Sequence, residues 1–475
     1  MSLPIEDLPA WSHLNDVSFS NVKVTNTEGK GYGVLSQTDL TAAEGTTETP
    51  ILLTVPHNLV LNAAAVEEHA KEDKDFRQLL EALELRSART DILLFLLVQT
   101  ARASRTSHPS VGVSNPWAEY LQFLPKTVSV PTMWPEQERL LLRGTSLWSA
   151  VDAKLRALSS ELQTIHEASS GIPGWDELLW EGNNPVFFSD WVRLDALYRS
   201  RCLELPRSGE SMVPCIDMIN HSSSATAYYD ENSKDEVVLR LRPRSSISGG
   251  EEVTISYGDN KSAAEMLFSY GFIDTTSTAE SLVLPLMPFA DDPLAKAKLV
   301  AFGKAPKLHV ARENGTIRWE SEFAHLKCVN EEDGLEFRVL QETDGGRQLR
   351  VFWKDEDVTD RTAEFEELNK SHDFPAVMRL RTVVVVEECL QAQLDWLEES
   401  QHDERPSELD QDCVRSATLL RQIEAALLRD TLTQLEQEKN SLLASENVVA
   451  YLGSMETASL DLAGAEASNE DEDFS

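Results

Sequence analysis

Short apolar runs alternate with turn residues in the first part of the chain. Valine and leucine runs between residues 17 and 60 flank a glycine cluster at residues 29–33, which is typical of short strands separated by turns. From Phe76 to Val98 the apolar residues instead recur at spacings of three and four, the period of a helix with one buried face. The pattern therefore predicts a small β region followed by a helical region that continues to about Ser200.

Strand character returns after the helical region. Residues 237–241 and 252–256 have the apolar content of strands and lie on either side of a glycine turn, and the second predicted strand ends at Tyr257. A helix should follow, with Asp259 or Asn260 available as its N-cap because both residue types accept a backbone hydrogen bond there. The helical region is thus predicted to be an insertion within a β domain.

The composition shifts again after Asp274. Residues 308–358 are predicted to be partly β, and from Val383 onward the apolar spacing is that of helices. The predicted fold class is α+β, a β-rich domain interrupted by a helical insertion and followed by a mostly helical C-terminal domain with a β stretch. The predicted segments are the N-terminal part of the β domain at 17–60, the helical insertion at 61–200, the C-terminal part of the β domain at 201–274, a C-terminal domain at 275–462 and an acidic, disordered tail at 463–475.

The chain is strongly acidic. Its 475 residues include 43 Lys and Arg against 80 Asp and Glu, which gives a formal net charge of −37. Such a charge repels the phosphates of nucleic acids and of anionic membranes, so we expect a basic protein as partner, with no direct nucleic acid and no membrane. Residues 387–475 hold 22 acidic and 5 basic residues, and this segment is either a solvated helical face with an acidic tail or a surface that attracts a basic protein.

The cysteines and the N-terminus indicate the cellular compartment of the protein. The five cysteines include no C-x-x-C pair, which argues against a disulfide framework or a zinc cluster. The N-terminus lacks the basic start and apolar stretch of a signal peptide, and the most apolar window, Ile92–Val98, is far shorter than the roughly 20 residues of a membrane-spanning helix. We therefore expect a monomeric protein of the cytoplasm, the nucleus or both.

A glycine-rich run is the first cluster with candidate chemistry. It reads Gly29-Lys30-Gly31-Tyr32-Gly33, and glycine lets a backbone approach a ligand closely. Taken alone the run also fits an ordinary β turn. It is not a dinucleotide-binding fingerprint, because no helical pattern begins there.

Two further clusters contain hydrogen-bonding side chains at the ends of apolar segments. Asn220 and His221 follow the apolar residues 214–219. They can bind a polar ligand, or they can form a local cap in which His221 is a core histidine. A metal site is not indicated, because no second His or Cys lies at metal-ligand spacing. Tyr257 stands at a predicted strand end and Tyr270 at a predicted helix end. One such tyrosine is usually a core residue, but two of them downstream of Asn-His favour a site.

These clusters, in this order and around a helical insertion, resemble those of the SET-domain protein lysine methyltransferases, in the branch typified by the plant Rubisco large-subunit methyltransferase. Residues 115–120 and the Leu124-Pro125 pair resemble the helical insert of that branch, and the likeness runs from Val17 to Ile273. The resemblance implies a β-rich SET domain around the insertion and a C-terminal domain that binds substrate. That C-terminal domain is mostly helical in the branch, so the β stretch at 308–358 is a departure.

The resemblance also implies a methyl donor and a set of site residues. The donor is S-adenosyl-L-methionine, the acceptor is a lysine of a basic protein, and no metal is implied. The implied catalytic residues are Tyr257, beside the transferred methyl, and Tyr270. The implied cofactor-binding residues are Lys30, Gly31, Tyr32, Gly33, Arg201, Asp217, Asn220, His221 and Tyr257. The overlapping glycines leave two registers of the turn open, and Cys202-Leu203 stands where the family usually has Ala-Phe.

Methyl transfer requires residues of these types. The amine, the methyl and the sulfur must be aligned for an in-line displacement. Only a neutral amine can attack, and free lysine has a pKa of about 10.4, so the site must favour deprotonation. Tyr257 and Tyr270 supply an apolar wall and hydroxyl oxygens that stabilise the partial positive charge on the methyl.

Several functions are compatible with these residues. The leading hypothesis is a lysine N-methyltransferase acting on a non-histone protein such as a ribosomal protein or a translation factor, since no C-x-C zinc cluster follows residue 274. The alternatives are a catalytically silent SET fold that binds peptides, a histone methyltransferase, and a scaffold built on the C-terminal helices.

Overall fold

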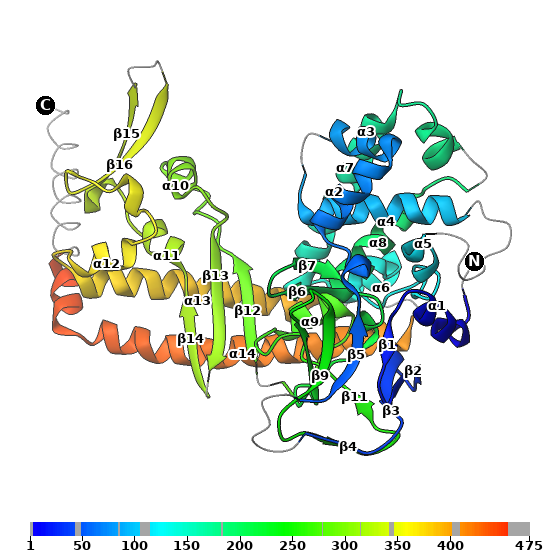
Figure 1. Ribbon diagram of the computed structural model, residues 1–475. Coiled ribbons are helices and arrows are strands. Elements are labelled where there is room, and N and C mark those ends of the chain that lie inside the picture. The colour runs from blue at the N-terminus through cyan, green and yellow to red at the C-terminus, as the bar shows by residue number, and fades with distance from the viewer. Residues whose placement is uncertain are drawn as a thin grey trace, which may run out of the picture. The chain divides into compact units, whose positions relative to one another are not determined.

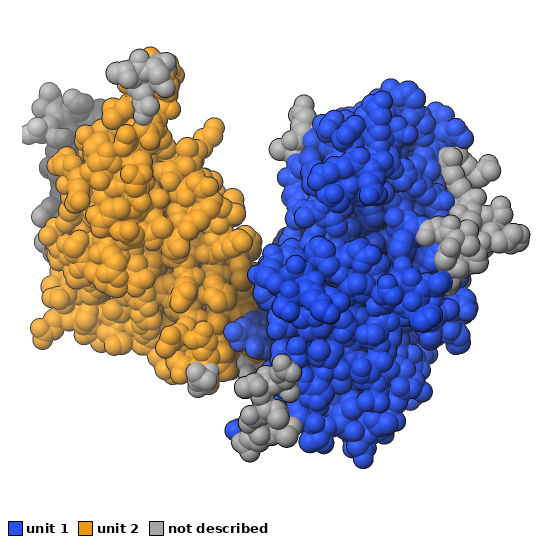
Figure 2. Space-filling view, in the orientation of Figure 1, with its two compact units in different colours: residues 1–140, 147–278 blue, residues 141–146, 279–475 orange. Residues whose placement is uncertain are grey.

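The chain forms two compact units in a computed structural model. The structure describes residues 3–42, 49–83, 86–104, 115–181, 184–277, 279–313, 315–341, 346–400 and 409–454. Unit 1 comprises residues 1–140 and 147–278, and unit 2 comprises residues 141–146 and 279–475 (Figure 2). The predicted acidic tail at 463–475 lies outside the described residues.

Unit 1 contains small antiparallel sheets that join strands from both sides of the helical insertion (Figure 1). The four-stranded sheet has the order β1 (Ser18–Phe19), β5 (Ile51–Val55), β9 (Val237–Leu241), β8 (Ala227–Glu231), and the three-stranded sheet has the order β11 (Glu252–Val253), β3 (Gly31–Ser36), β2 (Val22–Thr27). Two strand pairs complete the unit, β4 (Leu40–Thr41) with β10 (Ser246–Ile247) and β6 (Cys202–Leu205) with β7 (Gly209–Met212). Because β5 pairs with β9 and β3 with β11, the β domain closes across the insertion, as the sequence predicts.

The helices of unit 1 lie mostly in the insertion. They are α1 (Leu8–Leu14), α2 (Ala63–Glu72), α3 (Lys74–Ala82), α4 (Ala88–Ser104), α5 (Pro116–Tyr120), α6 (Glu136–Arg139), α7 (Leu147–Ser169), α8 (Phe188–Arg201) and α9 (Ala263–Tyr270). The apolar window Ile92–Val98 forms the middle of α4, and its seven side chains are buried because α2, α5 and α8 pack around it. In the described part of the chain, no helix combines the length and apolar character needed to cross a membrane.

A buried carboxylate fixes α8, the helix that ends at Arg201. The Asp195 side chain is fully buried and pairs with Arg89, with Lys154 at 2.8 Å and with Arg199 at 2.8 Å. Several cations are needed because an unpaired buried carboxylate costs several kcal/mol. The pairs therefore hold the end of α8 in a defined place.

The predicted cap of α9 is wrong. Ser262 is the N-cap, and its hydroxyl accepts from the Glu265 amide while the Glu265 carboxylate accepts from the Ser262 amide. This reciprocal capping box satisfies two N-terminal N–H groups at once, whereas Asp259 accepts a hydrogen bond from Ser256. The preceding strand is also shorter than predicted, since β11 ends at Val253.

Unit 2 combines two antiparallel sheets with long helices. The sheets are β12 (Glu280–Pro285), β13 (Lys307–Glu313), β14 (Thr316–Glu320) and β15 (Leu335–Gln341), β16 (Arg347–Trp353), β17 (Glu356–Asp357). The helices are α10 (Ala295–Phe302), α11 (Glu322–Lys327), α12 (Phe365–Lys370), α13 (Pro375–Glu399) and α14 (Gln411–Leu443), of which α13 and α14 pack along each other. The α+β fold class is confirmed, including the β stretch within residues 308–358.

Residues 141–146 leave the insertion and pack within unit 2. The buried Arg421 guanidinium donates to the carbonyls of Leu141 at 3.1 Å and Leu397 at 2.9 Å. The buried Glu424 carboxylate accepts from the amide of Ser146 at 3.0 Å and from its hydroxyl. The segment is thus held by two charged side chains of α14.

Glu424 should make the stability of unit 2 depend on pH. Burial raises the pKa of Glu424 to about 7, although hydrogen bonds from Ser146 oppose the shift. Its proton is therefore held more tightly in the folded state, so its contribution to stability is complete below the ordinary pKa and is lost as the pH rises through about 7. We expect the wild-type free energy of unfolding to fall by ~3 kcal/mol on this account in urea titrations between about pH 5 and pH 9.

The variant Glu424→Gln should flatten that pH dependence, because the amide stays neutral and its oxygen can still accept from Ser146. Glu436→Gln is the matched control, since Glu436 is exposed on the same helix. Equal flattening in both variants would contradict the assignment.

Candidate active site

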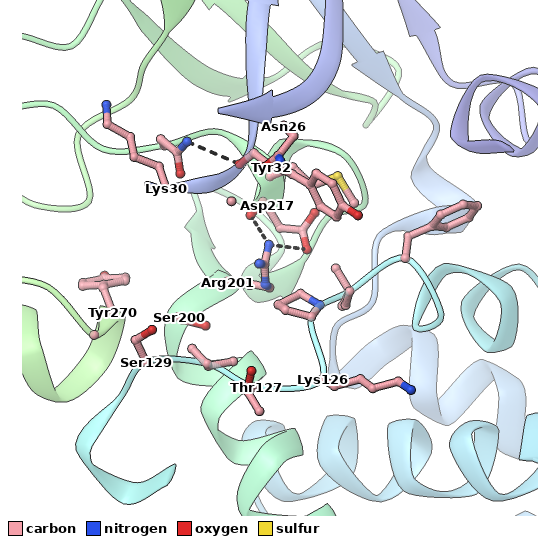
Figure 3. Close-up of a pocket in the computed structure, with 18 of the residues that line it drawn as sticks. Asn26, Lys30, Tyr32, Lys126, Thr127, Ser129, Ser200, Arg201, Asp217 and Tyr270 are labelled. Carbon is pink, nitrogen blue, oxygen red and sulfur yellow. Dashed lines mark hydrogen bonds and ion pairs between the residues drawn. The ribbon is translucent and has the colours of Figure 1, made fainter. Parts of the chain in front are cut away.

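A large cavity lies in unit 1 and has a volume of about 1040 Å³. This is at the upper end of the range of about 300–1,000 Å³ that is usual for ligand pockets. Six parts of the chain line most of it, namely residues 26–32, 122–129, 200–201, 217–221, Tyr257 and 270–272. Figure 3 shows part of this wall. The cavity gathers segments that are far apart in sequence.

The glycine run forms the turn between β2 and β3. Gly29 and Gly31 have φ values of +74° and +79°, and a Cβ built on Gly31 would meet no atom within 4 Å. Gly31 therefore supplies open backbone to the cavity, in a conformation that favours glycine. Gly33 does not line the cavity: a Cβ there would lie 2.7 Å from Glu252 Oε1 and 2.9 Å from Asn220 Nδ2. The successive glycines thus have different roles.

Asn220 and Glu252 connect the turn to the rest of the wall. Asn220 Nδ2 donates to Glu252 Oε1 at 2.7 Å and to the Tyr32 carbonyl at 3.3 Å. Lys30 Nζ donates to the other Glu252 oxygen at 2.8 Å. Glu252 is absent from the predicted site residues, yet it orients both a predicted asparagine and a predicted lysine.

His221 joins three segments through its two ring nitrogens. Nδ1 accepts from the Tyr257 amide at 3.0 Å, so Nε2 carries the ring proton and donates to Asp274 Oδ2 at 3.1 Å. Burial acts to raise the pKa of Asp274, but hydrogen bonds from Ser223, Thr276 and His221 outweigh it and lower that pKa. An ionised Asp274 therefore fixes the tautomer of His221 and, through it, the backbone at Tyr257.

The rings of the two tyrosines are in contact at a tilted angle of 35°. Their ring centroids are 4.6 Å apart, Tyr257 Oη donates to the Ile219 carbonyl at 2.7 Å, and Tyr270 Oη donates to the Tyr257 carbonyl at 3.3 Å. Burial raises the pKa of both phenols, that of Tyr270 to about 12. Both hydroxyls are therefore protonated at neutral pH.

Arg201 and Asp217 form an ion pair in the wall, and each keeps one polar atom without a hydrogen bond in the described part of the chain. Arg201 Nη1 donates to the Asp217 carbonyl at 2.7 Å and lies 3.6 Å from Asp217 Oδ2 (Figure 3). The Tyr120 hydroxyl donates to the other carboxylate oxygen. Arg201 Nε and Asp217 Oδ2 are buried, and neither has a hydrogen-bond partner among the described residues. Buried polar atoms without partners are costly, so these two are suited to a polar, charged ligand.

A second cavity shares this wall. It has a volume of about 300 Å³, and the residues lining both cavities are Ser200, Arg201, Asp217, Tyr257 and Tyr270. Its remaining lining includes Tyr198, Cys202, Glu204, Glu210 and Tyr229. Two ligands, one in each cavity, can thus reach the same tyrosines.

The structure brings together nearly all of the predicted site residues. The large cavity is lined by Lys30, Gly31, Tyr32, Arg201, Asp217, Asn220, His221, Tyr257 and Tyr270. Gly33 lies behind the wall. Sequence reasoning missed the loop at 122–129, for which only Leu124-Pro125 gave a signal, and it missed Glu252 and Asp274. Among the described residues, no group of three or more His, Cys, Asp or Glu side chains could hold a metal ion.

Comparison with known proteins finds similar sequences over most of the chain. No protein-family model matches it. SET domain-containing protein 8 of Schizosaccharomyces pombe is 29% identical over 90% of this chain and 93% of the relative. The Rubisco large-subunit N-methyltransferase of Pisum sativum is 25% identical over 62% of this chain and 58% of that enzyme. Human N-lysine methyltransferase SETD6 is 26% identical over 66% of this chain and 67% of that enzyme.

Solved structures show the same fold. The SET domain of LSMT, crystallised with lysine and AdoHcy, matches with a TM-score of 0.68 and 21% identity over 92% of each chain. Rubisco LSMT bound to AdoMet matches with a TM-score of 0.67 over 93% of each chain. The resemblance to the Rubisco LSMT-like branch of SET-domain proteins is confirmed, and the likeness extends beyond residues 17–273.

Gly33→Ala should destabilise unit 1. Its methyl would overlap Glu252 Oε1 and Asn220 Nδ2, so the hydrogen bond between them would have to shift. We expect a cost of about 1–3 kcal/mol in thermal or urea unfolding, as for other overpacked sites. Gly249→Ala is the control, because a Cβ there meets atoms no closer than 3.5 Å. If Gly33→Ala leaves the free energy of unfolding unchanged, the side chains around this glycine can move aside and the expected destabilisation is wrong.

Proposed function

We propose that this SET-domain chain is an S-adenosyl-L-methionine-dependent protein-lysine N-methyltransferase. The observation that carries the proposal is the wall shared by the two cavities, which contains Tyr257, Tyr270, Arg201 and Asp217. Methyl transfer needs a donor and an acceptor that approach one point from opposite sides. Relatives named lysine N-methyltransferases and neighbours crystallised with AdoMet, AdoHcy or lysine support this assignment.

The large cavity suits the methyl donor. S-adenosyl-L-methionine supplies a methyl group on a sulfonium together with a zwitterionic amino acid end. Arg201 Nε has no hydrogen-bond partner among the described residues and can donate to a carboxylate, and Asp217 Oδ2, which pairs with Arg201 Nη1 at 3.6 Å, accepts no hydrogen bond from them and is open to one from an ammonium group. The open backbone at Gly31, the side chain of Asn220 and the loop at 122–129 line the rest of the space available to the nucleoside.

The tyrosines act as hydrogen-bonding dipoles. Because both phenols stay protonated at neutral pH, neither serves as a phenolate base. Their buried, aromatic environment disfavours an ammonium group and so lowers the pKa of an incoming lysine. The substrate proton leaves to water through the second cavity. Tyr257 is held for this role by Ile219 at its hydroxyl and by His221 at its amide.

The proposed acceptor is a lysine in a basic, non-histone protein of the cytoplasm or the nucleus. The net charge of −37 favours a basic partner. The named targets among the relatives are ribosomal protein, Rubisco and fructose-bisphosphate aldolase, none of which is a histone. Mass spectrometry of lysine methylation in cells with and without the gene tests this class.

Tyr257→Phe should abolish most of the transfer. The change removes the hydroxyl but keeps the ring and the amide that His221 binds, so folding should be preserved. We expect a loss of at least about 10²-fold in kcat, as for the removal of one positioned donor. The measurement is the transfer of labelled methyl from S-adenosyl-L-methionine to lysines in an extract that lacks the enzyme.

Tyr228→Phe is the matched control for this experiment, because Tyr228 lines neither cavity. If the wild type and Tyr257→Phe transfer no methyl while the wild type binds lysine peptides, the chain is a silent binding module and the proposal is wrong.

The rate of transfer should rise with pH. The reacting species is the neutral amine, whose fraction grows toward the lysine pKa of about 10.4 or its lowered value in the cavity. The tyrosines should add no break, because the pKa of Tyr270 is about 12 and that of Tyr257 is raised further by burial. A kcat profile that falls between about pH 7 and pH 9 while the protein stays folded would contradict this role.

A further inference from the structure

The Tyr120 side chain lies behind Asp217, a residue of the wall that the two cavities share. Tyr120 is the last residue of α5, is fully buried and lines neither cavity. Its hydroxyl oxygen accepts from the Cys215 amide at 2.7 Å, and its O–H donates to Asp217 Oδ1. Burial raises the pKa of Tyr120, so the phenol keeps its proton and remains a donor. One hydroxyl therefore connects α5 to the segment that carries Asp217.

Aromatic packing fixes the ring of Tyr120 independently of its hydroxyl. The ring centroids of Trp11, Trp117 and Phe123 lie 5.0, 5.5 and 6.4 Å from that of Tyr120. Both indoles are buried, and that of Trp11 donates to the Pro116 carbonyl at 3.2 Å. Aromatic rings in such contact stabilise one another beyond the area that they bury. A phenylalanine at position 120 would therefore keep the position of the ring.

The backbone before Asp217 also depends on this hydroxyl. Cys215 has a φ of +69°, in the left-handed region that residues other than glycine rarely adopt. Cys215 directly precedes the 3₁₀ turn Ile216–Met218, and the bond from its amide to Tyr120 ties this turn to α5. The Tyr120 hydroxyl thus holds Asp217 both at its side chain and through the backbone that leads to it.

The bond to Tyr120 leaves one oxygen of Asp217 for a ligand. Oδ1 accepts from Tyr120, whereas Oδ2 lies 3.6 Å from Arg201 Nη1 and accepts no hydrogen bond from any residue that the structure describes. The Asp217 side chain is 1% exposed. A buried carboxylate oxygen without a donor is costly, so Oδ2 points to a donor on a bound ligand. Asp217 lines both cavities, so a ligand there can supply it.

The same bond helps to keep Asp217 ionised. The charged and titratable groups that face it are the Arg201 guanidinium, the Tyr120 and Tyr257 phenols and the Cys215 thiol. Burial raises the pKa of Asp217, while Arg201 and the hydrogen bond from Tyr120 lower it. Without the Tyr120 hydroxyl, Asp217 would take up a proton at a higher pH. A protonated carboxyl group has no charge with which to attract an ammonium group.

We propose that Tyr120 is a positioning residue of the methyl-donor site, and that its hydroxyl holds Asp217 Oδ2 toward the ammonium group of S-adenosyl-L-methionine. This inference rests on the proposed function and deepens it. Arg201 receives the carboxylate of the same amino acid end, and Tyr120 acts on the donor only through Asp217. The amino acid end is the same in the ground state and in the transition state, so Tyr120 affects the binding of the donor and not the transfer step.

The test compares two ligands by calorimetry on the full chain, S-adenosyl-L-homocysteine and its analogue without the α-amino group. Tyr120→Phe removes the hydroxyl and keeps the ring. It should weaken the binding of S-adenosyl-L-homocysteine about tenfold, because Asp217 loses a charge-assisted hydrogen bond. Binding of the analogue should not change. The loss should begin at a higher pH than in the wild type as the solution is acidified, because Asp217 is then protonated more readily.

Steady-state assays and two further variants separate positioning from a general effect on the fold. Tyr120→Phe should raise KM for S-adenosyl-L-methionine by the same factor and keep kcat at saturating donor within about twofold. Tyr228→Phe is the matched control, because the Tyr228 hydroxyl lies 3.4 Å from that of Thr49 and Tyr228 lines neither cavity. Asp217→Asn removes the charge and keeps an oxygen for Tyr120. Adding Tyr120→Phe to it should cause no further loss, because both changes act on one contact.

Three outcomes would overturn the positioning role. They are an equal loss of affinity for both ligands in Tyr120→Phe, full affinity for S-adenosyl-L-homocysteine in that variant, and additive losses in the double variant. Should Tyr120→Phe fail to fold, Asp217→Asn alone keeps the proposal falsifiable, because equal losses for the two ligands there would exclude an ammonium contact at Asp217. Failure of the proposed function gives a different result: the wild type then binds S-adenosyl-L-homocysteine with the dependence on Tyr120 but transfers no methyl group.

Discussion

The imidazole of His221 is the interaction on which the site depends. Each of its nitrogens binds a different segment, Nδ1 the amide of Tyr257 and Nε2 the carboxylate of Asp274. The parallel bridge between His221 and Ile255 adds backbone bonds on the same side. Tyr257 lies beyond the end of the two-residue strand β11 and has little regular structure to hold it, so its position depends on these bonds. A hydroxyl placed to within a fraction of an ångström needs such support.

The same logic applies to the floor of the large cavity. Glu252 lies on β11 and is paired with Leu35 of β3, which keeps its side chain beside the glycine turn. From there it binds Asn220 and Lys30. The absence of a side chain at Gly33 makes room for this contact. Sheet pairing, one glycine and one carboxylate thus convert a flexible turn into a defined surface.

Periodicity and residue type predict much of this molecule. The helical insertion and the β stretch in residues 308–358 follow from local patterns, and the convergence of Asn220, His221 and Tyr257 is what the resemblance to the SET-domain family implies. What the sequence could not show depends on long-range contacts. Asp274 contacts His221 across 53 positions, and Ser262 displaces Asp259 as a cap because it has a partner in Glu265. In both cases the role of the residue depends on its partner and not on its own residue type.

The net charge shows a similar limit of prediction from the sequence. The net charge of −37 is a property of the whole surface, and it can raise the rate at which basic proteins arrive. At physiological salt, however, each exposed charge is screened within about 8–10 Å. A distant acidic helix therefore cannot distinguish one surface lysine from the next. That distinction requires groups that line the cavity itself. The arrival of a basic protein and the selection of one lysine are accordingly separate physical problems.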